Sequence, residues 1–569
     1  MKHITSKSIS DWGTRWRVFV YLGLFLTILV AGGAYAYGTK NLSQRFGWIL
    51  TAYCVNWLGI PNLKIPGLNL PAGQIVNALE PPYQSQKNFR FAVKTFYGSP
   101  AIGYGLSLAI LLAVGRTFRH KKADDEHIRG AEMSDVKTLK KMLRGKPSNF
   151  GLGGVPVPTE VEPTHFLFAG GIGSGKTLAF RQALEAIHGQ DQRAIIADPN
   201  GEFLTIFFRA GDVILNPFDA RGVSWSPFAE MRGVWDADRL AQSLIPDGEG
   251  ENKSWNLYAQ QLLSAVLQRL WERGHCTNGE LARLLGVAES AEFRELVAGL
   301  PAQRVFEPSN DTYRGNVLGI ISAYAKALAW LDPAAGADGF SIRNWVENGE
   351  RGWIFLTYRD DQLAALRPLI AAWIDVVASA ILGLAENRER RVWLALDEFA
   401  GLGKIQGIEP FLTKARKAGG CALLGLQSIS QLHDTYGPKK AQTLLSCLGT
   451  WLVLRQSDPE TAEAMSLFLG DREVLRQSES GSKGGDGSGN WSEQITKTRL
   501  IMPAELQRLA PRHGYLSLLG AYPICPVEMP IPARQPGAAP AFLMRDNKSS
   551  RAAVVTTAKP ADGLDFTDW

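Results

Sequence analysis

The sequence has few cysteines and a small net charge, and both properties limit the classes of protein to which it can belong. Its 569 residues include five cysteines, which lie far apart and form no C-x-x-C pair. That spacing excludes a cysteine zinc site and a disulfide framework, and it indicates a mostly reducing compartment. The formal net charge of +6 is small for this length, so it permits a nucleic-acid partner without requiring one. A segment resembling the LSGGQ signature of ABC transporters is also missing.

Long uncharged runs are present, and two of them lie near the N-terminus. Residues 18–37 lack charge over about 20 residues, which is enough to cross a bilayer as a helix. Residues 99–115 form a second uncharged run at the short end of that range. We therefore predict two transmembrane helices. The first run could instead be a cleaved signal peptide, and the second a buried core helix.

Basic residues flank the two runs on their outer ends. Arg15 and Arg17 precede the first run, and Arg116 and Arg119 follow the second. The positive-inside rule then places the N-terminal residues 1–17 and everything after the second run in the cytoplasm. The loop between the runs, residues 38–98, is predicted to lie on the outer side.

Beyond the second run, short apolar segments alternate with amphipathic stretches. The apolar segments are unbroken, as in strands that are buried on both faces, and their alternation with helices predicts a parallel α/β sheet. A central region lacks convincing strands, and we predict that it is an inserted all-α domain. The predicted boundaries are 116–150 for a basic connector, 151–230 and 346–535 for the α/β domain, 231–345 for the insert, 477–494 for a flexible loop and 536–569 for a flexible tail.

A glycine-rich loop, "GGIGSGKT", follows the first apolar segment and opens an amphipathic stretch. It fits the phosphate-binding pattern G-x-x-x-x-G-K-[ST] in the strand-to-helix context that the pattern needs, although a chance glycine turn is the alternative. The backbone amides of such a loop wrap phosphates. We therefore predict an ATP site in which Lys176 reaches the β- and γ-phosphates and Thr177 binds Mg²⁺. The loop residues are Gly170, Gly171, Ile172, Gly173, Ser174, Gly175, Lys176 and Thr177.

Acidic residues close a later apolar segment, "RVWLALDEF". We predict that Asp397 holds Mg²⁺ and that Glu398 activates the attacking water, because buried carboxylates at a strand end need cations or water. A helix N-cap with an acidic first turn is the alternative. Asp198, at the end of "AIIADP", could compete for the magnesium role.

Two further residues fit a motor-type site. Gln427 ends the segment "ALLGLQ", where its amide could sense the γ-phosphate, although an ordinary polar strand end is the alternative. Arg416, in "LTKARKAGG", could project into a neighbouring subunit as an arginine finger. A solvated basic helix end is the other interpretation of Arg416.

Taken together, these motifs resemble the conjugative type IV coupling proteins of the TraD/TraG type. The resemblance runs from the first uncharged run to about residue 535, and its ordered set of motifs is more specific than the phosphate loop alone. Ile172 departs from it, since many members have Thr there. The motifs are "HIRGAE" (127–132), "GGIGSGKT", "DPNGE" (198–202), "NPFD" (216–219) with Arg221 and Trp225, "LDEFAGLGKI" (396–405), "GLQSISQL" (425–432) and "GYLSLLGAYP" (514–523).

The resemblance implies a RecA-like P-loop NTPase domain, an all-α domain that faces the cytoplasm, and a homo-hexameric ring in the bacterial inner membrane, with residues 38–98 in the periplasm. It also implies an ATP hydrolase that recruits the relaxosome. Such a motor would pull single-stranded plasmid DNA, and possibly double-stranded DNA, with its relaxase toward a secretion channel. Spacing in the family supports Arg416 as the finger and Gln427 as the sensor.

Two other functions remain as alternatives. A septal chromosome-segregation translocase shares the motor core, but nothing after residue 535 could fold as its C-terminal winged helix. A substrate receptor or scaffold whose ATPase only gates assembly cannot be separated from a motor by sequence. The tail ends with Leu564, Phe566 and Trp569 between acidic residues, which favours docking to a basic relaxosome accessory protein over a solvated tail without a partner.

Overall fold

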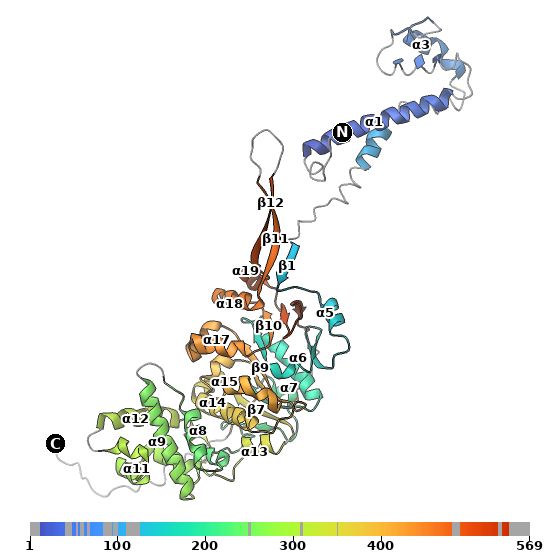
Figure 1. Cartoon of the computed structure of the whole chain (residues 1–569). Coiled ribbons are helices and arrows are strands. Elements are labelled where there is room, and N and C mark those ends of the chain that lie inside the picture. Colours follow the sequence, from blue (N-terminus) through green and yellow to red (C-terminus); the bar gives the residue numbers. More distant parts are fainter. Residues whose placement is uncertain are drawn as a thin grey trace, which may run out of the picture. The chain divides into compact units, whose positions relative to one another are not determined.

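The chain forms two compact units, Met1–Asp125 and Glu126–Trp569, which we describe separately. Figure 1 traces both units in a computed structural model of the chain. The structure describes residues 12–39, 48–49, 51–52, 55–56, 62–64, 69–83, 94, 101–109, 126–248, 252–307, 311–349, 351–480, 490–532 and 537–545.

In the first unit, two helices pack side by side. Helix α1 (Trp12–Thr39) contains the first predicted span, and residues 101–109 form a helix within the second. The rest of the second span, 99–100 and 110–115, lies outside the described residues. A third helix, α3 (Ala72–Tyr83), belongs to the loop that we predict to be on the outer side.

Close contacts between small and aromatic residues set the direction of this pairing. The Phe19 and Tyr104 rings lie 5.6 Å apart, and the Ser107 hydroxyl donates to the Phe19 carbonyl at 3.0 Å. A Cβ atom at Gly23 would lie 2.4 Å from the Tyr104 ring, and one at Gly103 would lie 2.3 Å from the hydroxyl oxygen of a threonine in α1. As residue numbers increase along α1, the numbers of the residues they contact in 101–109 decrease. The two helices are therefore antiparallel.

Among the described residues, one helix is long and apolar enough to cross a membrane, α14 (Asp360–Leu382) in the second unit. The protein buries 72% of its apolar window, which marks α14 as a core helix. The described apolar stretch of α1, Phe19–Gly33, is shorter than a full membrane span.

The second unit is built on a nine-stranded sheet. Seven strands are parallel, and the two at one edge, β13 and β14, are antiparallel. Each predicted apolar segment forms a strand. In spatial order the strands are β14 (Cys525–Glu528), β13 (His513–Ser517), β10 (Thr450–Leu454), β4 (Phe166–Ala169), β9 (Gly420–Leu426), β8 (Val392–Leu396), β5 (Arg193–Pro199), β7 (Trp353–Tyr358) and β6 (Val213–Ile214).

Both faces of this sheet are covered, which explains the unbroken apolar runs. In β4, Phe166 and Phe168 enter one buried cluster with helix α6, whereas Leu167 and Ala169 enter another with α14. Alternation of side chains along a strand sends successive residues to opposite faces. The helices outside the insert, apart from α14, are α5 (Val136–Met142), α6 (Lys176–Gly189), α7 (Leu204–Phe207), α15 (Ile408–Lys414), α16 (Ile429–Tyr436), α17 (Pro438–Ser446), α18 (Pro459–Leu469) and α19 (Pro503–Arg508).

The predicted insert is helical throughout its described part. Between residues 231–248, 252–307 and 311–345 the backbone pairs in isolated bridges but forms no strand. Helix α8 packs against α14, and one buried cluster contains residues of both, so the insert shares a core with the sheet. The helices of the insert are α8 (Trp235–Leu244), α9 (Asn252–Glu272), α10 (Asn278–Val287), α11 (Ser290–Leu296), α12 (Asp311–Ala325) and α13 (Ile342–Glu347).

A second sheet forms a long arm (Figure 1), and it shortens the flexible loop that the sequence predicted. Strand β11 (Asp471–Ser480) pairs with β12 (Asn490–Arg499) along its whole length, and β1 (Glu126–Gly130) pairs with β11. The predicted loop 477–494 is therefore wrong at both ends, because β11 and β12 remain paired up to Ser480, which lies opposite Asn490. Its glycine- and serine-rich centre, 481–489, lies outside the described residues.

Two boundaries of the second unit also differ from the prediction. Residues 126–150 are not a simple connector, because β1 joins the arm and β2 (Ser148–Leu152) pairs with β3 (Val155–Pro158) across the predicted boundary at 150. At the other end, residues 537–545 of the predicted tail bond to helix α7 and to the loop that follows β6. Neither contact leaves a local sequence signal. The rest of the tail, 546–569, lies outside the described residues.

Candidate nucleotide-binding site

The glycine-rich loop lies where its pattern predicts, between β4 and α6 at the carboxyl edge of the sheet. The amide of Gly170 donates to the Leu426 carbonyl and that of Gly171 to the Arg455 carbonyl, both at 2.9 Å, so neighbouring strand ends hold the loop. Gly175 has a φ of 103°, a left-handed conformation that favours glycine. The loop thus turns sharply and delivers Lys176 to the first turn of α6.

Lys176 and Thr177 both face Asp397, which directly follows β8. The Lys176 ammonium lies 3.7 Å from Asp397 Oδ1, and the Thr177 hydroxyl donates to Asp397 Oδ2 at 3.3 Å. Burial raises the pKa of Asp397, and the nearby Lys176 and Thr177 offset part of that rise. The structure therefore assembles the ammonium, hydroxyl and carboxylate that the sequence assigned to phosphate and Mg²⁺.

Glu398 follows Asp397 and begins a short helical turn, Phe399–Leu402. Its side chain makes no capping hydrogen bond to that turn. The capping role, which the sequence left as an alternative, is therefore absent, and the carboxylate stands half-buried beside Asp397.

Asp198 has a different task from the magnesium role that the sequence left open. It is fully buried and accepts hydrogen bonds from the amides of Phe203 at 3.0 Å and Leu204 at 2.7 Å. Burial raises the pKa of Asp198 to about 7, against the effect of these two bonds. Both carboxylate oxygens thus hold the turn that leads from β5 into α7.

A cavity of about 350 Å³ opens over the loop. Gln427, which follows β9, lines this cavity, so the structure brings the predicted sensor residue to the phosphate loop. Arg512, which precedes β13, also lines it. The two side chains come from opposite sides of β4 in the sheet order, with Gln427 on the side of Asp397.

The sequence did not reveal Arg512. Its amide donates to the Ser174 carbonyl at 2.8 Å, and its φ of 70° is unusual for a residue with a side chain. The guanidinium pairs with Glu528 at 2.9 Å and donates to the Met529 carbonyl at 3.1 Å. The motif "GYLSLLGAYP" begins two residues after Arg512 but does not include it, and the position of Arg512 depends on the pairing of β13 with β10, which a local pattern does not encode.

Arg416 lies at the opposite edge of the sheet from this cavity. It belongs to the turn Ala415–Ala418, just before β9 begins, where its side chain is exposed, whereas the glycine loop follows the end of the parallel strand β4. The seven residues of β9 span about 20 Å, which is beyond the reach of an arginine side chain. Arg416 therefore cannot enter the nucleotide site of its own subunit.

The buried polar groups of the site fit a magnesium nucleotide. Among the described residues, Ser174 Oγ and Asp397 Oδ1 are buried and have no hydrogen-bond partner. Unsatisfied buried oxygens are costly unless a ligand completes them. An ammonium, a hydroxyl and a carboxylate around a glycine loop match the donors and acceptors that phosphate oxygens and a hard cation require.

Comparison with known families and proteins points in one direction. A family model described as the type IV secretion-system coupling protein DNA-binding domain matches residues 149–530. The coupling protein TraD of Escherichia coli (strain K12) is 28% identical over 458 residues, which cover 78% of this chain and 64% of TraD. The protein VirD4 of Rhizobium rhizogenes is 25% identical over 363 residues, covering 58% of this chain and 53% of VirD4. The chain thus spans less than two thirds of the length of either relative.

Solved structures of the plasmid coupling protein TrwB are similar in both sequence and fold. The unbound form of TrwBdeltaN70, a bacterial conjugative coupling protein, is 36% identical with a TM-score of 0.68, and the match covers 74% of this chain and 96% of that one. A TrwB complex with ADP and Mg²⁺ is 35% identical with the same TM-score, covering 74% of this chain and 99% of that one.

Proposed function

The chain belongs to the family of type IV secretion-system coupling proteins, and from that premise we propose that it is a membrane-anchored ATPase that pumps single-stranded plasmid DNA to a secretion channel. The single observation that carries the enzymatic part is the assembly of Lys176, Thr177 and Asp397 around one glycine loop. The TrwB structures with ADP and Mg²⁺ and with a non-hydrolysable ATP analogue support a nucleotide at this place.

In this proposal each residue of the site has one task. The loop amides and Lys176 bind the phosphates, and Thr177 and Asp397 hold the cation, which would neutralise charge on the phosphates. Glu398 orients and deprotonates the attacking water. Gln427 contacts the terminal phosphate from the end of β9, where a change of contact can be transmitted along that strand. These four tasks are those of a P-loop motor.

Arg416 completes the site of a neighbour in the proposed homo-hexamer. Its place at the far edge of the sheet excludes a role in its own site and fits a finger that acts across an interface. An arginine of this kind supplies about 10³ to 10⁵ in rate where it has been measured.

The first unit is proposed to anchor the chain in the inner membrane with two spans. Apolar side chains stand exposed on both packed helices: Tyr21, Leu24, Phe25, Ile28, Leu29, Ile102, Leu106 and Leu108. Such a surface is stable in lipid rather than in water. Because the helices are antiparallel, their outer ends share one side, which agrees with the basic residues that flank both runs.

The partners follow from the same proposal. Relaxase and a relaxosome accessory protein would deliver the DNA, and the channel components would receive it, with the bulk of the chain in the cytoplasm. A gate that hydrolyses ATP without moving DNA is the remaining alternative, since it needs the same site residues.

The test is ATP hydrolysis by the full chain in detergent or vesicles, with and without single-stranded DNA, together with plasmid transfer in cells. We expect stimulation by DNA, and we expect Lys176→Ala to abolish both hydrolysis and transfer while membrane insertion stays intact. Hydrolysis and transfer should be lost because the variant lacks the Lys176 ammonium charge, which no neighbour replaces. Normal transfer by Lys176→Ala would overturn the motor. Transfer by a variant that binds ATP but does not hydrolyse it would instead favour the gate.

A further inference from the structure

The end of the described chain, residues 537–545, lies as an extended strap across the second unit. Its backbone is bonded at several points: Ala538 donates to Thr205 at 2.6 Å, Leu543 accepts from Ala220 at 2.7 Å, and Arg545 donates to Phe218 at 2.9 Å. Met544 forms an antiparallel bridge with Asp219. The strap therefore spans helix α7, which follows β5, and the loop after β6.

A buried carboxylate organises the β6 side of this contact. Asp219 is fully buried and holds Arg221 through both oxygens, at 2.9 and 2.7 Å. The same carboxylate accepts from the Leu543 amide at 3.3 Å, and Arg221 donates to the Pro540 carbonyl at 2.8 Å. A fully buried carboxylate that is paired and hydrogen-bonded is costly to break, so this pair fixes the strap rather than merely touching it.

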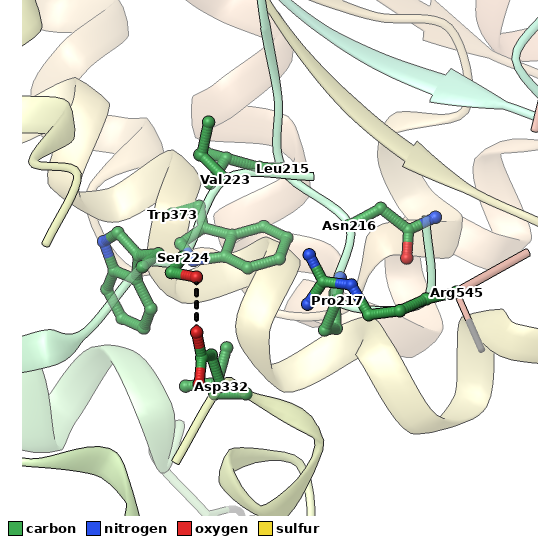
Figure 2. Close-up of a pocket in the computed structure, with 10 residues that line it drawn as sticks. Leu215, Asn216, Pro217, Val223, Ser224, Asp332, Trp373 and Arg545 are labelled. Atoms are coloured by element: carbon green, nitrogen blue, oxygen red, sulfur yellow. Dashed lines mark hydrogen bonds between the residues drawn. The ribbon is translucent and has the colours of Figure 1, made fainter. Parts of the chain in front are cut away.

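Arg545 closes the strap over a small cavity (Figure 2). Its guanidinium donates to the Gly222 carbonyl at 2.8 Å and stands at the cavity beside Asn216 and Trp373. The cavity holds about 10 Å³, room for a single water at most. The cavity is therefore a small gap that the Arg545 side chain covers, and it is too small to be a ligand pocket.

On the β5 side the strap touches the turn that Asp198 holds. Gly201 has a φ of 68°, and a Cβ atom there would lie 2.5 Å from the Ala541 carbonyl oxygen. The strap thus passes directly over this turn at a point where a side chain has no room. The turn is also tied to β7, because the Asn200 amide donates to the Tyr358 carbonyl at 2.7 Å.

This turn lies beside the catalytic edge of the sheet. Strands β5 and β8 are parallel neighbours with Ala197 opposite Leu396, so Asp198 and Asp397 follow at the same edge. Glu202 sits at the end of the turn, where partial burial raises the pKa of its carboxyl, the negative charge of Asp397 adds to the rise, and Arg181 offsets part of it. The position of the turn therefore fixes where a further carboxylate stands relative to Asp397.

We propose that residues 537–545 are a positioning strap, which holds the Asp198–Glu202 turn and with it Glu202 against the catalytic edge, so that turnover depends on this C-terminal segment. The inference rests on the proposed ATPase activity. It also makes the strap a mechanical link, since a load on the chain that follows Arg545 acts on the turn beside Asp397.

Two truncations of the full chain separate the strap from the rest of the tail. A chain that ends at Arg545 keeps the strap and should retain DNA-stimulated hydrolysis, because no site residue is lost. A chain that ends at Pro532 lacks the strap, and its kcat should fall about tenfold to a hundredfold, as expected when a reacting group shifts by about 1 Å. Its KM for ATP should stay within about twofold, because the phosphate loop does not contact the strap residues named above. Equal kcat in the two chains would overturn the inference.

Rescue and exchange measurements guard against a folding defect. A synthetic peptide of residues 537–545, added to the chain that ends at Pro532, should restore kcat. Amide hydrogen exchange at Phe203 and Leu204 should accelerate without the strap, with a peptide from α18 as internal control. This readout needs no hydrolysis, so it remains informative even if the chain proves not to be an ATPase. Unchanged exchange at both amides would refute the strap without touching the proposed function.

A double-mutant cycle tests whether the strap acts through Glu202. Arg545→Ala and Glu202→Gln should each lower kcat in the full chain, and together they should lower it by less than the product of the two effects. Independent, multiplicative effects would mean that the strap does not position Glu202. Arg388→Ala, which removes an exposed arginine that pairs with Glu386, is the matched control and should leave kcat unchanged.

Discussion

Thr177 donates its hydroxyl hydrogen to Asp397 at 3.3 Å, although the two residues lie 220 positions apart in the chain. The contact exists because β8, β9 and β4 are parallel neighbours, so the turns that follow them meet at one edge. Ligands of open parallel sheets bind at this carboxyl edge. The relation between the two side chains ties the phosphate loop to the acidic strand end.

Glu398→Gln should bind ATP normally and hydrolyse it about 10² to 10⁴ times more slowly. The amide keeps the shape of the side chain and loses the charge that activates water. Nucleotide affinity by fluorescence titration and single-turnover hydrolysis measure the two effects separately. Loss of ATP binding as well as turnover in this variant would instead indicate that Glu398 has a structural role.

Arg416→Ala should be inactive alone and regain activity in mixed rings with Lys176→Ala subunits. Such rings contain interfaces at which an intact glycine loop faces an intact arginine. Hydrolysis by mixtures of the two tagged variants, purified through both tags, measures the rescue. Mixed rings without activity would mean that Arg416 is not a finger in trans.

Arg512→Ala should raise the KM for ATP several-fold and leave kcat within about twofold. Lys176 and Asp397 fix the phosphate end of the cavity, so the nucleoside is expected at the Arg512 side. A guanidinium over a purine ring contributes about 0.5 to 2 kcal/mol, and stacking is nearly independent of the base, so GTP should be affected equally. Arg512→Lys separates charge from planarity, because it keeps the charge and loses the stacking plane. A defect confined to ATP would indicate hydrogen bonding to adenine instead.

Glu230→Gln should destabilise the second unit by about 3 kcal/mol. The Glu230 carboxylate is fully buried and accepts from the Trp225 indole, the Ser341 hydroxyl and the amides of Ile342 and Arg343, at 2.7 to 3.1 Å. In the glutamine variant, an NH₂ group replaces one carboxylate oxygen, so a donor faces some of these donors and their hydrogen bonds are lost. Thermal unfolding measures the loss, and the exposed Glu386→Gln, with a change below about 0.5 kcal/mol, is the control.

Much of the nucleotide site could be predicted because its signals are local. Three features each follow a short apolar run: the glycine loop, the acidic strand end at Asp397 and the polar strand end at Gln427. These runs are apolar throughout because both faces of the sheet are buried. Parallel strands then bring such ends together without further information. The sequence could therefore place three separate segments in one site before any contact between them was known.

The remaining features depend on pairings between distant segments. Nothing near Arg512 indicates that its amide bonds to Ser174, and nothing near Glu126 indicates that it pairs with Leu475, 349 residues later. The polar character of the arm strands predicted a loop, because backbone pairing stabilises them in place of apolar burial. Residues 537–545 are mostly apolar, but their backbone bonds and the Asp219–Arg221 pair join them to distant segments, which the local sequence does not encode. Asp198 was ambiguous for the same reason, since its partners are amides that every sequence possesses.

The strand order of the large sheet also governs how the chain is made. Strand β4 carries the glycine loop near the start of the second unit, but its two neighbours, β9 and β10, are synthesised more than 250 residues later, with Phe166 opposite Leu423 on one side and Thr450 on the other. Until Leu426 has left the ribosome, β4 and its phenylalanines have no lateral partner, and the second partner is complete only at Leu454. Sheets closed by such distant pairings fold slowly and expose apolar surface meanwhile. The nascent chain is therefore expected to need chaperone protection over this interval, and the ATP site forms only after most of the polypeptide is complete.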